Sequence, residues 1–520
     1  MAESLELYTK PEETPLNETK DPDLHQKYEE KSFTEKLRDL KKNITVEPML
    51  AGFVIPSVIS KFAMGYFNLY KVCRINFEYP EDICNPSGYS STNYTSVNAT
   101  AYERDVQKVI TSMDIWKSII NTVLPCIVIV FLAAWSDRTG KRKLVILLPI
   151  FGELITSVNN IINVYFFKEI PVELTVFLES LFTSVSGGWV LMFLGVFSYI
   201  SDITTEQSRT FRVGLVNFCM TVGIPIGIGI SGILITNLGF YALFSVTFAL
   251  FLLVFVYGII CIKEPDDILK EKGLPIVQRD VKAKVSFFAV SNVADTIKVA
   301  FRKRPSNRRM KVILTLIAVL VLYGPSMSEN SIFYLFLRNR LQWDVVQYSV
   351  YLSYSTVLHS VGAMTCITIF SKKLQIDDAL LCLISIASKF VGSVWTAFAK
   401  ANWEIYMIPV AEIFTGTTFT SLRSIMSKLI DQDETAKVNS LFSLTETLAS
   451  LIFQPFYSWL YMNTLQAMSG AVFLTSASLI VPASFILTVF YILSQRELSK
   501  ARRNAHEEEE KKKFCKNTPA

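Results

Sequence analysis

Histidine and charged residues are scarce in this chain of 520 residues. It has three histidines, His25, His359 and His506, and 19% of its residues are charged, whereas 51% are hydrophobic. With so few histidines we do not expect a histidine-based metal site. A Gly-x-Ser-x-Gly elbow, a Gly-x-x-x-x-Gly-Lys-Ser/Thr phosphate loop, His-Glu-x-x-His and Cys-x-x-Cys are also absent from the sequence. We therefore expect no enzyme, no cofactor and no metal, and the net charge of +5 is too small and dispersed to suggest nucleic-acid binding.

The hydrophobic residues fall in runs of about twenty, separated by charged patches. An α-helix needs about twenty apolar residues to cross the hydrocarbon layer, where its backbone groups must bond internally. The runs predict twelve membrane-spanning helices, at about 48–70, 113–136, 144–167, 172–200, 213–237, 240–262, 310–337, 346–370, 374–397, 403–426, 438–460 and 469–494. Six spans on each side of a long charged segment indicate an all-α membrane protein of two matched six-helix bundles.

The placement of Lys and Arg predicts which side each segment faces. Cytoplasmic loops are enriched in these residues, and here they gather at 138–143, 209–212, 302–309 and 372–373, against a minority at Arg338, Arg340 and Lys400. Both termini are then expected in the cytoplasm. The expected organisation is a tail at 1–47, a bundle at 48–262 with an outer loop at 71–112, a central loop at 263–309, a bundle at 310–494 and a tail at 495–520. We expect no signal peptide and mobile, solvated tails.

The expected outer loop carries two cysteines and two N-glycosylation sequons. These are Cys73, Cys84, Asn93 and Asn98. Cysteines and glycan acceptors together indicate the oxidising side of a membrane. We expect a Cys73–Cys84 disulfide, with free thiols as the alternative, and glycans on both asparagines.

The loop after the second expected span reads AAWSDRTGKRK over residues 133–143. This resembles the major facilitator signature Gly-x-x-x-Asp-x-x-Gly-Arg/Lys-Arg/Lys, with Ala133 in place of the first glycine. The resemblance implies a conformational latch, in which the aspartate at a helix end pairs with basic groups across the two halves. The latch residues would be Asp137, Arg138, Gly140, Lys141 and Arg142. A tight loop with cytoplasmic positive charge is the alternative.

Residues 136–142, 201–204, 209–212 and 423–429, with the cysteine-bearing outer loop, carry a narrower resemblance. In these segments the chain is similar to solute carrier family 46, which contains the proton-coupled folate transporter. The resemblance implies a major facilitator fold in which helices one, four, seven and ten line a central cavity. It also implies secondary transport of a small anionic solute, with proton coupling as a further hypothesis, by a monomer in the lipid bilayer.

Two alternatives to this interpretation stay open at the level of sequence. One is a folate or pterin carrier proper, although the fifth span has no acidic residue and the seventh no histidine, which the folate-transporting branch uses. The other is a non-transporting membrane receptor. We expect the plasma membrane rather than the lysosomal membrane as the location.

Ionisable side chains within the expected spans are the candidate pathway residues, because each costs about 2.5 to 3.5 kcal/mol at mid-bilayer. The candidates are Lys61, Glu179, Glu329, His359, Glu412 and Arg423. His359 is the one histidine in a span and titrates near physiological pH when unperturbed, with a structural hydrogen-bonded histidine as the alternative. Glu153 and Lys389, on spans expected to be peripheral, are expected to support structure.

Several of these positions have two interpretations. Lys61 either attracts an anionic group or pairs with a glutamate. Glu329, after the Gly324-Pro325 interruption, either belongs to a gate near the outer mouth or follows a proline kink. Arg423 either contacts the substrate anion or forms an interhelical ion pair. A glycine-rich stretch at 223–232 predicts close helix packing.

Overall fold

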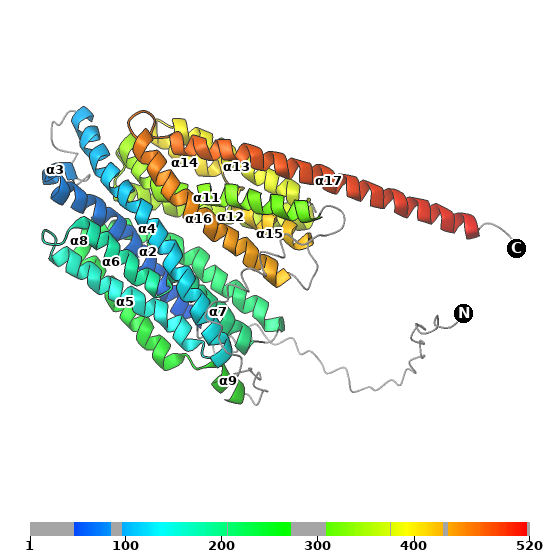
Figure 1. Ribbon diagram of the computed structural model, residues 1–520, viewed down its shortest axis with the longest axis horizontal. Coiled ribbons are helices and arrows are strands. Elements are labelled where there is room, and N and C mark those ends of the chain that lie inside the picture. The colour runs from blue at the N-terminus through cyan, green and yellow to red at the C-terminus, as the bar shows by residue number, and fades with distance from the viewer. Residues whose placement is uncertain are drawn as a thin grey trace, which may run out of the picture. The chain divides into compact units, whose positions relative to one another are not determined.

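The computed structural model describes residues 46–84, 96–204, 206–271, 308–374, 376–429 and 435–516. The chain divides into two units, 1–45 and 46–520, and the fold is that of the second unit. Within the described ranges every regular element is a helix and none is a strand (Figure 1). Nine of the described helical stretches are long and apolar enough to cross a membrane, judged by length and composition.

The first half of the described chain holds the first six expected spans. Its elements are α2 (Val46–Lys71), the π-helix η1 (Val72–Asn76), α3 (Glu81–Cys84), α4 (Ser96–Thr139), α5 (Lys143–Tyr165), α6 (Val172–Val185), α7 (Gly188–Ile203), α8 (Glu206–Cys261) and the short α9 (Pro265–Glu271). The fifth and sixth expected spans lie within α8 and meet at Gly239, whose φ of 72° interrupts the helix. The second span starts earlier than expected, because α4 begins at Ser96 rather than near 113. The run of apolar residues marks only the part of a helix that lies in lipid. Polar turns that continue the helix outside the lipid therefore do not appear in the hydropathy pattern.

The second half holds the other six expected spans. Its elements are α11 (Arg308–Leu341), α12 (Val345–Thr365), the π-helix η3 (Cys366–Lys373), α13 (Asp378–Phe398), α14 (Asn402–Ala411), the 3-10 turn η4 (Thr415–Thr417), α15 (Thr418–Lys428), α16 (Thr435–Thr464) and α17 (Ala471–Lys516). The tail expected to be mobile from about 495 instead continues α17 as helix. In the sequence, Glu507–Glu510 stand about four residues before Lys511–Lys513, a spacing that favours helix.

The fourth and tenth expected spans are both broken helices, at matching places in the two halves. In the first half, the chain between α6 and α7 turns at Gly187, and α7 begins at Gly188; their φ values of 79° and 50° belong to a left-handed backbone that glycine adopts readily. In the second half, α14 ends at Ala411 and the helix resumes at Thr418. Broken helices in corresponding positions of two repeats are typical of transporter binding sites.

The glycine-rich stretch of α8 packs against both halves. A Cβ at Gly223 or Gly227 would meet Val54 or Val58 of α2 at 3.2 and 3.0 Å. Gly229 and Gly232 face serines of α12, and α8 and α12 are extensively in contact, as are α4 and α16. The expected packing role of the stretch is therefore confirmed, and these two helix pairs join the halves.

Candidate functional site

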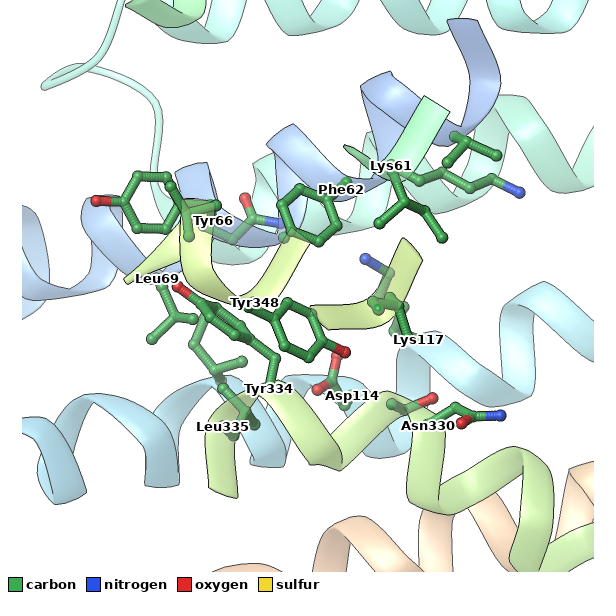
Figure 2. Close-up of a pocket in the computed structure, with 18 of the residues that line it drawn as sticks. Lys61, Phe62, Tyr66, Leu69, Asp114, Lys117, Asn330, Tyr334, Leu335 and Tyr348 are labelled. Atoms are coloured by element: carbon green, nitrogen blue, oxygen red, sulfur yellow. The ribbon is translucent and has the colours of Figure 1, made fainter. Parts of the chain in front are cut away.

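A cavity of about 570 Å³ lies between the two halves. Figure 2 shows its centre, where Lys61 and Phe62 of α2, Asp114 and Lys117 of α4, Asn330 and Tyr334 of α11 and Tyr348 of α12 gather from both halves. The broken fourth span contributes Trp189, directly after its glycines. This volume is in the range of natural small-molecule sites, which combine apolar walls with a few polar groups.

The cavity continues deeper along α4, away from the disulfide. A second space of about 580 Å³ shares Asp114, Lys117 and Ser331 with the first. Its lining comes mainly from α4 and α16 and is more polar, with Asn121 and Glu446 among its residues. The two spaces therefore form one path between the halves.

Two lysines bring positive charge to the cavity. The Lys117 ammonium lies 3.2 Å from the Glu179 carboxylate, which also accepts a 3.5 Å hydrogen bond from Asn68. The Lys61 ammonium lies 4.8 Å from the centre of the Trp189 ring, a cation–π contact. Among the described residues no carboxylate lies within ion-pair distance of Lys61. Lys61 is thus the cation of this cavity that is available to an anionic ligand.

Aromatic rings line the same cavity beside the two lysines (Figure 2). The rings of Phe62 and Tyr348 are stacked with centroids 5.7 Å apart, and Tyr334 lies 4.7 Å from Tyr348. Phe62 comes from the first half, whereas Tyr334 and Tyr348 come from the second. A flat apolar ligand between the halves would contact both sets of rings.

A second charge cluster lies inside the second half. Lys389 of α13 is 2.8 Å from Glu329 of α11 and 3.1 Å from Glu412, which follows the last residue of α14. The Nε2 atom of His359 on α12 is 4.0 Å from the other carboxylate oxygen of Glu412. Glu329, Glu412 and Lys389 expose 5%, 9% and 21% of their side chains. The structure therefore brings three predicted pathway residues together around Lys389.

Lys389 and Glu329 meet inside the second half. Lys389 is expected to support structure, and the ion pairs that it forms with two carboxylates are compatible with that role. Glu329 has two interpretations, a gate near the outer mouth or a proline kink. It does not line the described solute cavity, whereas its neighbours Asn330 and Ser331 do. One residue along a helix turns the side chain by about 100°, so Glu329 points into the bundle.

Arg423 forms an interhelical ion pair, one of the two expected arrangements. Its guanidinium lies 2.8 Å from Glu446 of α16 and 4.8 Å from the centre of the Phe442 ring. Half of the Arg423 side chain stays exposed. Because Glu446 lines the deeper part of the cavity, the pair lies beside the path.

The expected latch is described only in part. Arg142 bonds Asp202 at 2.8 Å and the Ser136 hydroxyl at 3.0 Å, and its backbone N–H donates to Glu264. Gly140 has a φ of 69° and Lys141 is exposed. The side chains of Asp137 and Arg138 lie outside what the structure describes. A latch between the halves therefore stays a prediction.

The outer end holds the expected disulfide and a contact between the halves. Cys73 and Cys84 are bonded, whereas Asn93 lies outside the described residues and Asn98 lies in the first turns of α4 without a described side chain. Across the halves, Arg338 of α11 lies 2.8 Å from Glu103 of α4.

A second contact between the halves lies one turn further along α4. Gln107 donates a 2.9 Å hydrogen bond to the Leu335 carbonyl and accepts one of 2.9 Å from the Tyr461 hydroxyl. Together with Glu103 and Arg338, these residues close the end of the path that bears the disulfide.

Sequence reasoning missed Asp114, Lys117 and Trp189. Both charged residues lie within the second expected span, three positions apart, which places them on the same face of one helix. That spacing was a signal available in the sequence. Trp189 carried no such signal, because its place depends on the break that precedes it.

Comparison with known proteins agrees with this architecture. The family profile described as Major Facilitator Superfamily matches residues 111–454. The lysosomal proton-coupled steroid conjugate and bile acid symporter SLC46A3 of Mus musculus is 26% identical over 408 residues, 76% of this chain and 84% of its own length. The "Probable peptidoglycan muropeptide transporter SLC46" of Drosophila melanogaster is 22% identical over 82% of this chain and 81% of its own length. The proton-coupled folate transporter of Rattus norvegicus is 24% identical over 68% of this chain and 73% of its own length.

Solved structures share the fold. The crystal structure of the nucleoside transporter NupG has a TM-score of 0.57 and 13% identity, covering 85% of this chain and 99% of that one. A POT family transporter in complex with 5-aminolevulinic acid has a TM-score of 0.55 and 12% identity, covering 86% of this chain and 96% of that one. The chain belongs to the major facilitator superfamily, whose members are transporters and not enzymes, and its curated relatives are members of solute carrier family 46.

Proposed function

We propose that this protein is a secondary active transporter that moves a small organic anion across a membrane by alternating access, with protons as the coupling ion. The observation that carries the proposal is the cavity between the halves, where Lys61 and Lys117 stand beside aromatic rings. A lysine attracts a carboxylate, sulfate or phosphate group, and the rings accept an apolar body.

The names of the relatives support an anionic solute. They refer to steroid conjugates, bile acids, folate and muropeptides, and bile acids and folate carry carboxylates. Two relatives are also named as proton-coupled. The closed disulfide end, with Glu103 and Arg338 in contact, fits a state in which the solute path is shut on one side.

Uptake by reconstituted protein tests the proposal. Purified protein in lipid vesicles would be given a labelled sulfated steroid, a bile acid or folate, with an inward proton gradient and with a protonophore control. We expect at least one probe to accumulate in the vesicles and the protonophore to abolish the accumulation. Binding of a probe without accumulation or exchange would instead favour a receptor.

Replacing Lys61 by glutamine tests its role in binding the anion. A hydrogen bond to a charged group contributes about 1.5 to 3 kcal/mol, so the apparent affinity for the probe should fall by roughly tenfold to a hundredfold. Lys263→Gln is the control, because its side chain is 57% exposed and pairs with Glu271 outside the cavity. Equal affinities in both variants would remove Lys61 from the binding site.

For location, we propose the plasma membrane, with both termini in the cytoplasm, glycans at Asn93 and Asn98, and a monomeric carrier. The name of the mouse relative makes the lysosomal membrane the alternative. Co-staining with markers of the two membranes in intact cells, with an epitope at each terminus, distinguishes these cases. A terminal epitope accessible from outside unpermeabilised cells would contradict the proposed sidedness.

A further inference from the structure

We infer that the second half of the molecule contains a proton-binding site of its own, apart from the solute cavity, in which Glu412 carries the proton. The site consists of Glu412, Lys389, Glu329 and His359. This inference rests on the proposed proton-coupled transport and assigns the coupling to particular residues.

The charges of the cluster do not balance without a proton. Glu329 and Glu412 together carry two negative charges, and Lys389 carries one positive charge. An uncompensated charge buried between helices is costly, and the usual response is to bind or release a proton. One proton makes the cluster neutral, so the cluster is built to hold one.

Two geometric features assign that proton to Glu412. Lys389 lies closer to Glu329, at 2.8 Å, than to Glu412, at 3.1 Å, which makes Glu329 and Lys389 the tighter ion pair. Glu412 is also the residue that caps the C-terminal end of α14. The helix dipole is negative at that end and disfavours a second negative charge.

The other titratable groups near the cluster bring no further charge. Among the described residues, those that face it are two tyrosines, Tyr351 of α12 and Tyr457 of α16. The Tyr457 hydroxyl is bonded to the Ser476 hydroxyl of α17 at 2.7 Å. Tyrosine is neutral at physiological pH. The proton count therefore depends on Glu329, Glu412, Lys389 and His359.

The cluster has a route for protons. His359 exposes 30% of its side chain against 9% for Glu412, so it is the member closer to the surface of the bundle. Within the described part of the chain, the His359 Nε2 atom is buried, makes no hydrogen bond and lies 4.0 Å from Glu412 Oε2. A proton carried on Nε2 passes to Glu412 Oε2 when the two atoms approach to hydrogen-bond distance, which leaves His359 neutral again and the carboxylate protonated. On the other side, a cavity of about 30 Å³ touches Glu329, Lys389 and Thr415 and has room for one water molecule.

The cluster is separate from the solute path but connected to it by one helix. The described linings of the two parts of the solute cavity contain none of its four residues. On α11, however, Glu329 is followed by Asn330 and Ser331, which line the cavity. When Glu412 gains or loses its proton, the ion pair between Lys389 and Glu329 becomes stronger or weaker. Because Glu329 lies on α11, this change can shift α11 and with it the residues of α11 that line the solute cavity.

Infrared spectroscopy of the purified full-length protein tests the site without any solute. At neutral pH we expect a protonated-carboxyl band that loses intensity in Glu412→Gln. The same band should be unchanged in Glu404→Gln, which removes a half-buried carboxylate from the first turn of α14, and should persist in His359→Gln. A spectrum of Glu412→Gln with the full wild-type band would overturn the inference.

Transport then separates this inference from the proposed function. In vesicles loaded with unlabelled sulfated steroid, exchange of the labelled compound needs no proton gradient, whereas accumulation does. Glutamine resembles a protonated glutamate, so Glu412→Gln should retain exchange and lose gradient-driven accumulation by tenfold or more. If the variant still accumulates the probe, or loses exchange as well, the inference is wrong. If the wild-type protein neither exchanges nor accumulates the probe, the proposed transport function is wrong. The infrared spectra still test whether Glu412 carries a proton.

Discussion

Lys389 is shared by two carboxylates in the interior of the second half, and it differs in kind from a lysine in a surface ion pair. We expect Lys389→Met to lower the free energy of unfolding by about 3 to 5 kcal/mol, because it leaves the buried charge of Glu329 without a cation. Denaturant unfolding of the purified protein followed by tryptophan fluorescence measures this. Adding Glu329→Gln to Lys389→Met should recover part of the loss.

A surface pair provides the control for this prediction. Lys263 and Glu271 are 2.6 Å apart but expose 57% and 60% of their side chains. Breaking an exposed pair costs about 1 kcal/mol or less. If Lys389→Met is as mild as Lys263→Met, the two buried carboxylates do not depend on Lys389.

Gly392 makes room for the Glu412 carboxylate. A Cβ at this position of α13 would overlap the carboxyl group of Glu412. We expect Gly392→Ala to cost about 1 to 3 kcal/mol of stability through overpacking and to impair transport by moving Glu412. Thermal unfolding and vesicle uptake measure the two effects.

The matched control is Gly214→Ala in α8, where a Cβ would meet no atom within 4 Å. Alanine in an open helical position should be neutral or stabilise by about 0.5 to 1 kcal/mol. If Gly392→Ala and Gly214→Ala lower stability and transport by similar amounts, the loss in Gly392→Ala does not come from the contact with Glu412.

At the scale of residues, the sequence was enough to find the buried charges but not their partners. Hydropathy gives the depth of Glu329 and Glu412 in their spans, but which way each side chain points depends on how the helices are rotated. Lys389 was set aside because its helix was expected to be peripheral. The break after Ala411 brings Glu412 to it, and no local pattern predicted that break.

At the scale of elements, the break in the tenth span is held by two serines of α13. Ser388 donates to the Ala411 carbonyl at 2.5 Å and Ser385 to the Phe414 carbonyl at 2.8 Å. Both carbonyls lie where the helix lacks its own donors. We expect Ser385→Ala to cost about 1 to 3 kcal/mol, the cost of an unsatisfied buried group, and to increase hydrogen exchange around 411–418.

Ser112→Ala is the comparison for this serine. Its hydroxyl is exposed and bonds the Val109 carbonyl of its own helix at 2.7 Å. Its loss should leave stability and hydrogen exchange within a few tenths of a kcal/mol of the wild type, as for other exposed substitutions. Equal exchange around 411–418 in the two variants would show that Ser385 does not hold the break.

The runs of apolar residues correctly predict the helices of both halves, because a helix that crosses lipid must have a certain length and an apolar composition. Ends and interruptions were less predictable. α4 extends outward to Ser96 through polar turns, and α8 joins two spans across Gly239. Interruptions of this kind depend on packing partners that lie far away in sequence.

At the scale of the whole molecule, the contacts of Glu103 and Gln107 hold the two halves together at the disulfide end. We expect Glu103→Gln to weaken this closure and to admit a membrane-impermeant maleimide to Cys126, which lines the deeper cavity. Labelling from the disulfide side should rise by roughly tenfold, equivalent to about 1.4 kcal/mol.

The labelling experiment requires that Cys126 be the reactive thiol. The other cysteines outside the disulfide would be replaced by serine: Cys219, Cys261, Cys366, Cys382 and Cys515. Glu271→Gln, which removes an exposed ion pair away from the closure, should not change labelling. Unchanged labelling in Glu103→Gln would mean that Glu103 and Arg338 do not control access from this end.

The cystine has a consequence for handling the protein. It fastens the segment after α2, where Arg74 donates to the Tyr79 carbonyl and the Tyr79 ring lies 4.6 Å from that of Tyr102, one residue before Glu103. Strong reductants during purification would free that tether and loosen the first turns of α4. Samples prepared for transport measurements should therefore be kept oxidised, and a host that exports this loop to an oxidising compartment suits production better than one that does not.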